Sequence, residues 1–329
     1  MKPFAYRRSM ALGGAREGGA RPLAGGTDLL PLLKQGLVAA DTLVDVASAP
    51  DPRARSVERL AGGGLRLGAL VTLAEVARHP EVRRECAALA EAAAASATPQ
   101  IRNVATVGGN LCQWNRCWYF RSGVACRVTG GDDCPARVGD HRHHAIFEPG
   151  ACIAVHPSDP AVALAALGAR VEVQGPDGSV RTTAIQSFLR PVEPGSPEQA
   201  ALGPGEVVWA VVVPGPTQRR RSAYEKAMDR RAWAFALVSA AVVVREEADG
   251  TVADASIALG AVAAVPWRAE AAAAVLRGRK LTAELAQEAA ARAVDGATPL
   301  PGNAYKVPLA IGLVRAALAR LLEPVPGPA

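Results

Sequence analysis

A segment of sixty residues, 100–159, concentrates the reactive side chains of this chain. It contains five of the six cysteines and four of the five histidines in the 329-residue sequence. Thiolates and imidazoles are soft metal ligands, and isolated core residues rarely gather so densely. The segment also contains a glycine pair, Gly108 and Gly109, whose backbone can approach a ligand closely. We therefore expect the fold to be built around redox cofactors in this region.

Length and charge exclude several classes of protein. A chain of 329 residues can form two or three domains with buried cores. It contains no apolar run of about 18 residues that could span a bilayer, so we expect no membrane partner. The net charge of +6 is modest, and the longest basic run, residues 219–221, lacks interleaved aromatics. A nucleic-acid partner is therefore not expected.

Four cysteines, Cys117, Cys126, Cys134 and Cys152, are separated by eight, seven and seventeen residues. Four thiolates complete the ligand shell of a [4Fe-4S] or a [2Fe-2S] cluster. Structural zinc is the alternative, but it usually takes two close pairs of ligands, and only Cys112 and Cys117 have such a spacing. Scattered free thiols are the third interpretation. The spacing by itself leaves all three open.

Hydrophobic periodicity predicts a mixture of helices and strands. The predicted helices span residues 29–35, 72–78, 82–95, 160–167, 268–276, 283–294 and 307–322. The predicted strands span residues 42–46, 65–70, 171–173, 180–182, 206–213, 235–244 and 253–259. Thr72 and Glu75 have the spacing of a capping box. Cys86 is expected to be a buried structural thiol. Residues 215–217 look like a linker, which places a domain boundary near Pro216.

Two glycine turns, at residues 24–28 and 105–110, resemble the paired FAD-binding motifs of the medium subunit of molybdenum hydroxylases, the xanthine dehydrogenase and carbon monoxide dehydrogenase group. Residues 260–268 and 303–307 resemble the C-terminal domain of the same subunit. The resemblance covers nearly the whole chain and implies an α+β fold. A two-lobed FAD-binding (PCMH-type) domain would span 1–216, with an inserted loop at about 112–153, and a smaller α+β domain would span 217–329.

The loop that carries the cysteines resembles a narrower subgroup. Residues 116–121 and 152–159 are similar to flavin subunits that also hold a [4Fe-4S] cluster, such as those of periplasmic aldehyde oxidoreductase and 4-hydroxybenzoyl-CoA reductase. The resemblance implies that Cys117, Cys126, Cys134 and Cys152 are the cluster ligands. It leaves Cys112 outside the ligand set.

The resemblance also assigns residues to FAD. The first turn would hold the pyrophosphate through backbone N–H groups, and Asp159 and Lys226 would lie near the flavin. Lys226 could also be an ordinary surface lysine. The implied set is Leu23, Ala24, Gly25, Gly26, Thr27, Asp28, Leu29, Ala105, Thr106, Gly109, Asn110, Asp159, Leu202 and Lys226. The stretch between Phe4 and Leu23 is shorter than in relatives, so an irregular first βα unit is expected.

The function that the resemblance implies is electron transfer. A large molybdopterin subunit would oxidise an aldehyde or aromatic substrate, a small [2Fe-2S] subunit would pass on the electrons, and FAD on this chain would deliver them to an external acceptor. No catalytic residue is expected here. The alternatives are a stand-alone flavin-dependent oxidase and a zinc-stabilised scaffold. The N-terminus lacks the apolar core of a signal peptide, so we expect a cytoplasmic location, or a periplasmic one if a partner carries the signal.

Overall fold

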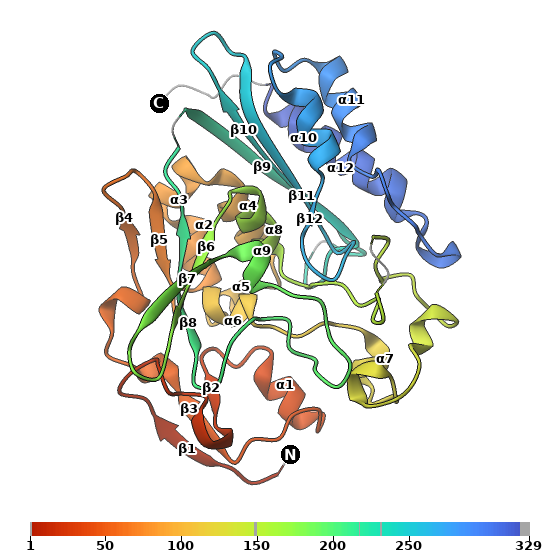
Figure 1. Ribbon diagram of the computed structural model, residues 1–329. Coiled ribbons are helices and arrows are strands. Elements are labelled where there is room, and N and C mark those ends of the chain that lie inside the picture. Colours follow the sequence, from red (N-terminus) through yellow and green to blue (C-terminus); the bar gives the residue numbers. More distant parts are fainter. Residues whose placement is uncertain (1, 148–149, 217, 231, 323–329) are drawn as a thin grey trace.

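The computed structural model describes residues 2–147, 150–216, 218–230 and 232–322. It contains three sheets, with helices layered between and outside them (Figure 1). Thr217, in the predicted linker, lies outside the described residues. Within them, no helix is both long and apolar enough to cross a membrane.

The N-terminal sheet is parallel, in the order β1-β3-β2. Its strands are β1 (Ala5–Arg8), β2 (Arg21–Leu23) and β3 (Thr42–Asp45). Between β1 and β2 the chain forms only a short 3-10 turn, η1 (Glu17–Gly19), where parallel strands are usually joined by a longer helix. The expected irregular first unit is therefore confirmed. Strand β2 leads into the first glycine turn and then α1 (Leu29–Lys34).

The central sheet is antiparallel, in the order β4-β5-β8-β6-β7. Its strands are β4 (Val57–Arg59), β5 (Leu65–Gly68), β6 (Arg170–Gln174), β7 (Val180–Ala184) and β8 (Val207–Val213). The helices associated with this sheet are α2 (Leu73–Arg78), α3 (Pro80–Glu85), α4 (Ala87–Ala95), α5 (Pro99–Arg102), α6 (Val107–Leu111), α8 (Asp159–Ala166) and α9 (Ile185–Phe188). The predicted hairpin of β6 and β7 and the capping box of Thr72 and Glu75 are both confirmed.

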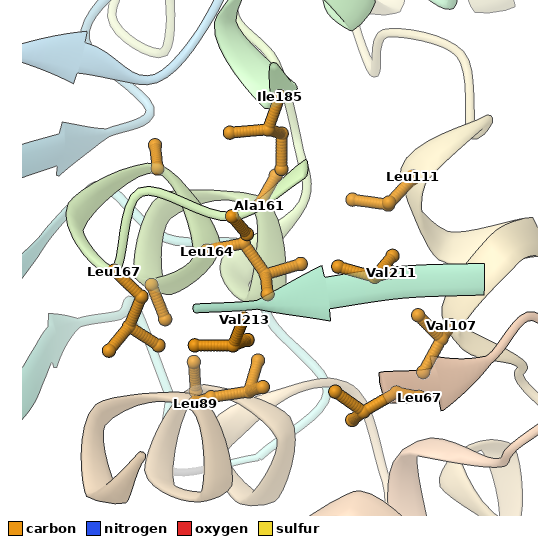
Figure 2. Close-up of a cluster of buried hydrophobic side chains, with 14 of the residues drawn as sticks. Leu67, Leu89, Val107, Leu111, Ala161, Leu164, Leu167, Ile185, Val211 and Val213 are labelled. Atoms are coloured by element: carbon orange, nitrogen blue, oxygen red, sulfur yellow. The ribbon is translucent and has the colours of Figure 1, made fainter. Parts of the chain in front are cut away.

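The first hydrophobic core forms where α4 and α8 pack between the central sheet and the C-terminal sheet. Figure 2 shows Leu164 of α8 and Leu167, which caps that helix, packed with Leu89 of α4 and with Val211 and Val213 of β8. These side chains are at most 3% exposed. Burial of such large aliphatic groups stabilises the fold and fixes the start of α8, where Asp159 lies.

The C-terminal sheet is antiparallel, in the order β12-β11-β10-β9. Its strands are β9 (Arg219–Ala227), β10 (Val238–Glu246), β11 (Val252–Gly260) and β12 (Trp267–Arg268). Its outer face is covered by α10 (Glu270–Leu276), α11 (Ala283–Arg292) and α12 (Lys306–Arg320) (Figure 1). A second core fills the space between this sheet and these helices.

The inserted loop at about 112–153, which we call the cysteine-bearing segment, contains little regular structure. Its described part has one helical turn, α7 (Trp118–Arg121), and the 3-10 turns η4 (Arg127–Thr129) and η5 (Pro135–Arg137). The remaining 3-10 turns are η2 (Val46–Ser48), η3 (Pro52–Ala54) and η6 (Pro301–Asn303). So irregular a loop depends on contacts with the rest of the molecule for its shape.

The far end of this segment packs into the C-terminal domain. Ile146 and Phe147 are fully buried within the C-terminal core. The ring of Phe147 stacks on Trp267, with the two centroids 4.3 Å apart. Lys306, also fully buried, donates from Nζ to the carbonyl oxygens of His144 at 2.9 Å and Ala261 at 2.6 Å. These contacts fix the segment against the C-terminal domain.

Three predicted elements differ from the structure. Residues 82–95 form two helices, α3 and α4, because Cys86 between them has φ −139° and ψ 51°. The N–H of Ala88 then bonds to Ser222 Oγ at 3.1 Å. The predicted strand at 235–244 begins only at Val238, since the chain first turns at Trp233, whose φ is 55°. The helix predicted at 268–276 begins at Glu270, because Trp267 and Arg268 pair with β11 and Ala269 is the N-cap.

Substitution of Phe147 tests the packing of the segment on the C-terminal core. Phe147→Ala should lower the free energy of unfolding by about 3–5 kcal/mol, because it opens a cavity in a fully buried site. Val138→Ala is the control, since that side chain is 94% exposed in the same segment and should change stability by no more than about 0.5 kcal/mol. Similar losses in both variants, measured by denaturant unfolding, would contradict this packing.

Burial of Lys306 predicts a pH-dependent stability. Desolvation lowers the pKa of Lys306 from 10.5 to about 7. Between these two values the unfolded chain binds a proton that the folded chain does not, so the free energy of unfolding should rise with pH in this window. Wild type should therefore gain stability relative to Lys306→Met as the pH is raised from 7 towards 10.5. A difference that does not vary with pH in denaturant titrations would refute the assignment.

Candidate functional site

The two glycine turns lie in contact. A Cβ atom at Gly25 would be 1.8 Å from the carbonyl oxygen of Val104, at the entrance to the second turn. Gly26 has φ 68°, a conformation that side chains disfavour. The second turn continues into α6, where Thr106 Oγ1 accepts from the N–H of Gly109 at 3.2 Å. Glycine at position 25 therefore brings together two motifs that are eighty residues apart in sequence.

The first turn presents backbone donors without protein partners. Within the described part of the chain, the backbone N–H groups of Gly26, Thr27 and Asp28 have no hydrogen-bond acceptor. All three residues line a cavity. Consecutive unpaired N–H groups are a common way to hold a phosphate without a lysine.

Two cavities meet at these turns. The large cavity, about 820 Å³, extends between the two domains, and the small cavity, about 170 Å³, lies over the first turn. Thr27 and Gln113 line both cavities, so the two spaces are adjacent. Two adjacent cavities with unpaired backbone amides beside them provide space and donors that suit a dinucleotide such as FAD.

Most of the residues predicted to bind FAD line these cavities. The small cavity is lined by Ala24, Gly25, Gly26, Thr27, Asp28, Leu29, Thr106, Gly109 and Leu202. The large cavity is lined by Thr27, Ala105, Asn110 and Asp159. Leu23 and Lys226 are not among the lining residues of either cavity, although Leu23 ends the strand that leads into the first turn.

Asp159 is held by a buried polar network at the wall of the large cavity. Its carboxylate accepts from Lys226 Nζ at 2.7 Å, from the hydroxyl of Tyr224 at 2.7 Å and from Ser96 Oγ at 3.2 Å. The Lys226 side chain is only 3% exposed, so its interpretation as a surface lysine is wrong. Burial, together with the Asp159 charge, raises the pKa of Tyr224 well above its ordinary value. Lys226 thus balances the charge of Asp159.

Tyr224 was not predicted from the sequence, although its spacing from Lys226 indicates that the two side chains lie close together. Tyr224 and Lys226 are two residues apart on β9, so their side chains point to the same face of the sheet. A lysine assigned to a cofactor therefore implies that residue 224 shares its surroundings.

The four predicted ligand cysteines converge. Cys117, Cys126, Cys134 and Cys152 line one narrow pocket of about 10 Å³, which we call the cysteine pocket. All six cysteines of the chain are free thiols. Cys112 lies apart and lines the small cavity, in agreement with its exclusion from the ligand set.

Burial makes the sulfurs of Cys117 and Cys152 poor thiolates. Desolvation raises the pKa of Cys152 to about 11 and also raises that of Cys117. Backbone N–H groups act in the opposite direction: those of Tyr119 and Phe120 at Cys117, and that of Ala154 at Cys152. A bound metal would deprotonate the thiols, and these N–H groups would then stabilise the sulfur charge.

The cysteine pocket and the large cavity share a wall. Cys117, His144 and Ala154 line both spaces. His144 Nε2 lies 3.2 Å from the Cys117 sulfur. His144 is one of the four histidines in the segment 100–159, and nothing in its spacing from Cys117, 27 residues away, indicates this contact.

Asp28 connects the first glycine turn to the cysteine-bearing segment. Its carboxylate accepts from the Trp114 N–H at 2.8 Å and from Arg121 at 2.9 Å, and it pairs with Arg116 at 2.8 Å. Arg116 lines the large cavity, so the pair reaches the wall of the site. The prediction placed Asp28 in the turn but did not identify these partners.

Comparison with known proteins matches both halves of this architecture. Residues 4–216 match the family described as FAD binding domain in molybdopterin dehydrogenase, and residues 222–321 match the CO dehydrogenase flavoprotein C-terminal domain. The aldehyde oxidoreductase FAD-binding subunit PaoB of Escherichia coli K12 is 41% identical over 280 residues, which cover 83% of this chain and 85% of that subunit.

Carbon monoxide dehydrogenases are also similar to this chain. The medium chain from Hydrogenophaga pseudoflava is 29% identical over 320 residues, covering 96% of this chain and 94% of the relative. A solved structure of carbon monoxide dehydrogenase from the same organism superposes with a TM-score of 0.72 at 27% identity, covering 97% of this chain and 96% of that one.

These matches confirm the predicted fold class, a two-lobed FAD-binding (PCMH-type) domain followed by an α+β C-terminal domain. They also agree with the glycine turns and the adjacent cavities, which provide the donors and the space for FAD. The chain therefore belongs to the family of FAD-binding medium subunits of molybdenum hydroxylases and is an FAD-containing oxidoreductase subunit.

Proposed function

We propose that this chain transfers electrons between FAD and a [4Fe-4S] cluster held side by side within one subunit of a molybdenum hydroxylase. The observation that carries the proposal is that Cys117 lines both the cysteine pocket and the large cavity. Electron transfer requires cofactors that are close and fixed in place, and the protein contributes this positioning and tunes their potentials. Because Cys117 lines both spaces, cofactors bound in them would be close together and fixed in place.

In this proposal FAD would extend across the two adjacent cavities. The turn from Leu23 to Leu29, with Thr106 and Gly109, holds the pyrophosphate where the cavities meet. The adenosine end occupies the small cavity beside Leu202, and the flavin ring occupies the large cavity beside Ala105, Asn110 and Asp159. Lys226 acts through its ion pair with Asp159. The FAD-binding domain spans 1–216 and the C-terminal domain 217–329, so the flavin lies between them.

The cluster is assigned to Cys117, Cys126, Cys134 and Cys152 in the inserted loop at about 112–153. Among the residues that the structure describes, no group of three or more Cys, His, Asp or Glu side chains is gathered closely enough for one metal ion. Sulfurs placed apart around a pocket suit a multinuclear cluster better than a single zinc ion. The pocket of about 10 Å³ is smaller than a cluster, so the irregular loop has to widen when the cluster binds.

The partners in this proposal are a small [2Fe-2S] subunit and a large molybdopterin subunit. The large subunit oxidises an aldehyde or aromatic substrate, and electrons reach an external acceptor through this chain. The similarity to PaoB, a subunit named for aldehyde oxidation, supports an aldehyde as the substrate class. It also favours a subunit over a stand-alone flavin oxidase. We propose a cytoplasmic location, or a periplasmic one if a signal-bearing partner exports the assembly.

Removal of one ligand tests the assignment of the two cofactors. Cys126→Ser should lose iron and the broad visible absorbance of the cluster while it retains FAD, because the flavin cavities lie outside the cysteine pocket. Cys86→Ala is the control, since Cys86 is fully buried elsewhere in the core and its loss should leave the iron content unchanged. The measurement is iron and flavin analysis of protein purified without air. Unchanged iron in Cys126→Ser would exclude this ligand set.

A further inference from the structure

His144 occupies a position that neither the glycine turns nor the four cysteines explain. It is 3% exposed and lines both the large cavity and the cysteine pocket. Its Nε2 atom lies 3.2 Å from the sulfur of Cys117. A buried imidazole between two cofactor spaces, in contact with a sulfur that borders both, can influence either cofactor.

The C-terminal domain fixes the backbone of His144. Its carbonyl oxygen accepts from Lys306 Nζ at 2.9 Å and from Asn303 Nδ2 at 3.3 Å. Lys306 and Asn303 are both fully buried. These bonds fix the backbone from which the imidazole extends.

Aromatic rings fix the imidazole from the other side. The rings of Trp118 and Tyr119, from α7, lie 6.1 Å and 6.4 Å from it between centroids. Within the described residues, the Nδ1 atom of His144 is buried and has no hydrogen-bond partner. The contact between Nε2 and sulfur is therefore the single side-chain hydrogen bond through which the ring is held among those residues.

We propose that His144 is a positioning residue that links the two cofactor sites by donating its Nε2–H to the Cys117 sulfur. This inference rests on the proposed cluster at the cysteine pocket. A hydrogen bond to a cysteine sulfur stabilises the more negative, reduced state of a cluster, so it raises the reduction potential. Through Lys306 and Asn303, the C-terminal domain thereby sets the potential of a cluster whose ligands all belong to the other part of the chain.

Two substitutions separate the hydrogen bond from the bulk of the ring. His144→Phe keeps a planar ring but removes the donor, whereas His144→Gln retains an N–H donor. His79→Phe is the matched control, because His79 lines neither the cavities proposed for FAD nor the cysteine pocket. The readout is the midpoint potential of the cluster, from a redox titration followed by low-temperature EPR of the purified holoprotein.

We expect His144→Phe to lower the midpoint potential, so that the ratio of reduced to oxidised cluster at a fixed potential falls about tenfold, or about 59 mV for a one-electron couple. His144→Gln should recover much of the loss, and His79→Phe should match wild type. Loss of iron from His144→Phe with retention in His144→Gln would also support the donor role. Wild-type potentials in both His144 variants, or loss of iron from both, would overturn the inference. Absence of a cluster from wild type would instead refute the proposed function.

Discussion

The carboxylate of Asp28 is the interaction on which the arrangement of the site most depends. It lies in the first glycine turn yet binds Trp114, Arg116 and Arg121, which flank Cys117, the first of the proposed ligand cysteines. The side chains of Asp28 and Arg121 are 13% and 11% exposed, so loss of Asp28 would leave the largely buried charge of Arg121 uncompensated. A single carboxylate thus places the turn proposed to hold FAD and the segment proposed to hold the cluster in one rigid frame.

The opposite end of the cysteine-bearing segment is fixed by interactions of a different kind. Phe147 packs against Trp267, and Lys306 binds the carbonyl oxygen of His144, so apolar stacking and buried hydrogen bonds replace ion pairs there. The segment is therefore attached to the first glycine turn at its start and to the C-terminal domain at its end. This explains how a loop with little regular structure can form a defined pocket next to a large interdomain cavity.

Much of this architecture could be predicted from local sequence patterns, because glycine turns, a capping box at Thr72 and apolar periodicity act over a few residues. The resemblance implied that four cysteines bind a cluster; the four line one pocket, and their role as ligands stays a prediction. What could not be predicted depends on distant partners. The break at Cys86 accompanies a bond between Ala88 and Ser222, 134 residues away, and the contact of His144 with Cys117 follows from how the loop folds back. The spacing of these residues in the sequence does not predict either contact.

The central claim is that FAD and an iron–sulfur cluster lie on the two sides of one wall formed by Cys117 and His144. Crystals of the protein purified without air, measured on both sides of the iron absorption edge, test this most directly. The account predicts anomalous iron density between Cys117, Cys126, Cys134 and Cys152, with the flavin ring in the cavity beyond His144. Iron located elsewhere, a single zinc ion at the cysteines, or a flavin outside that cavity would contradict it.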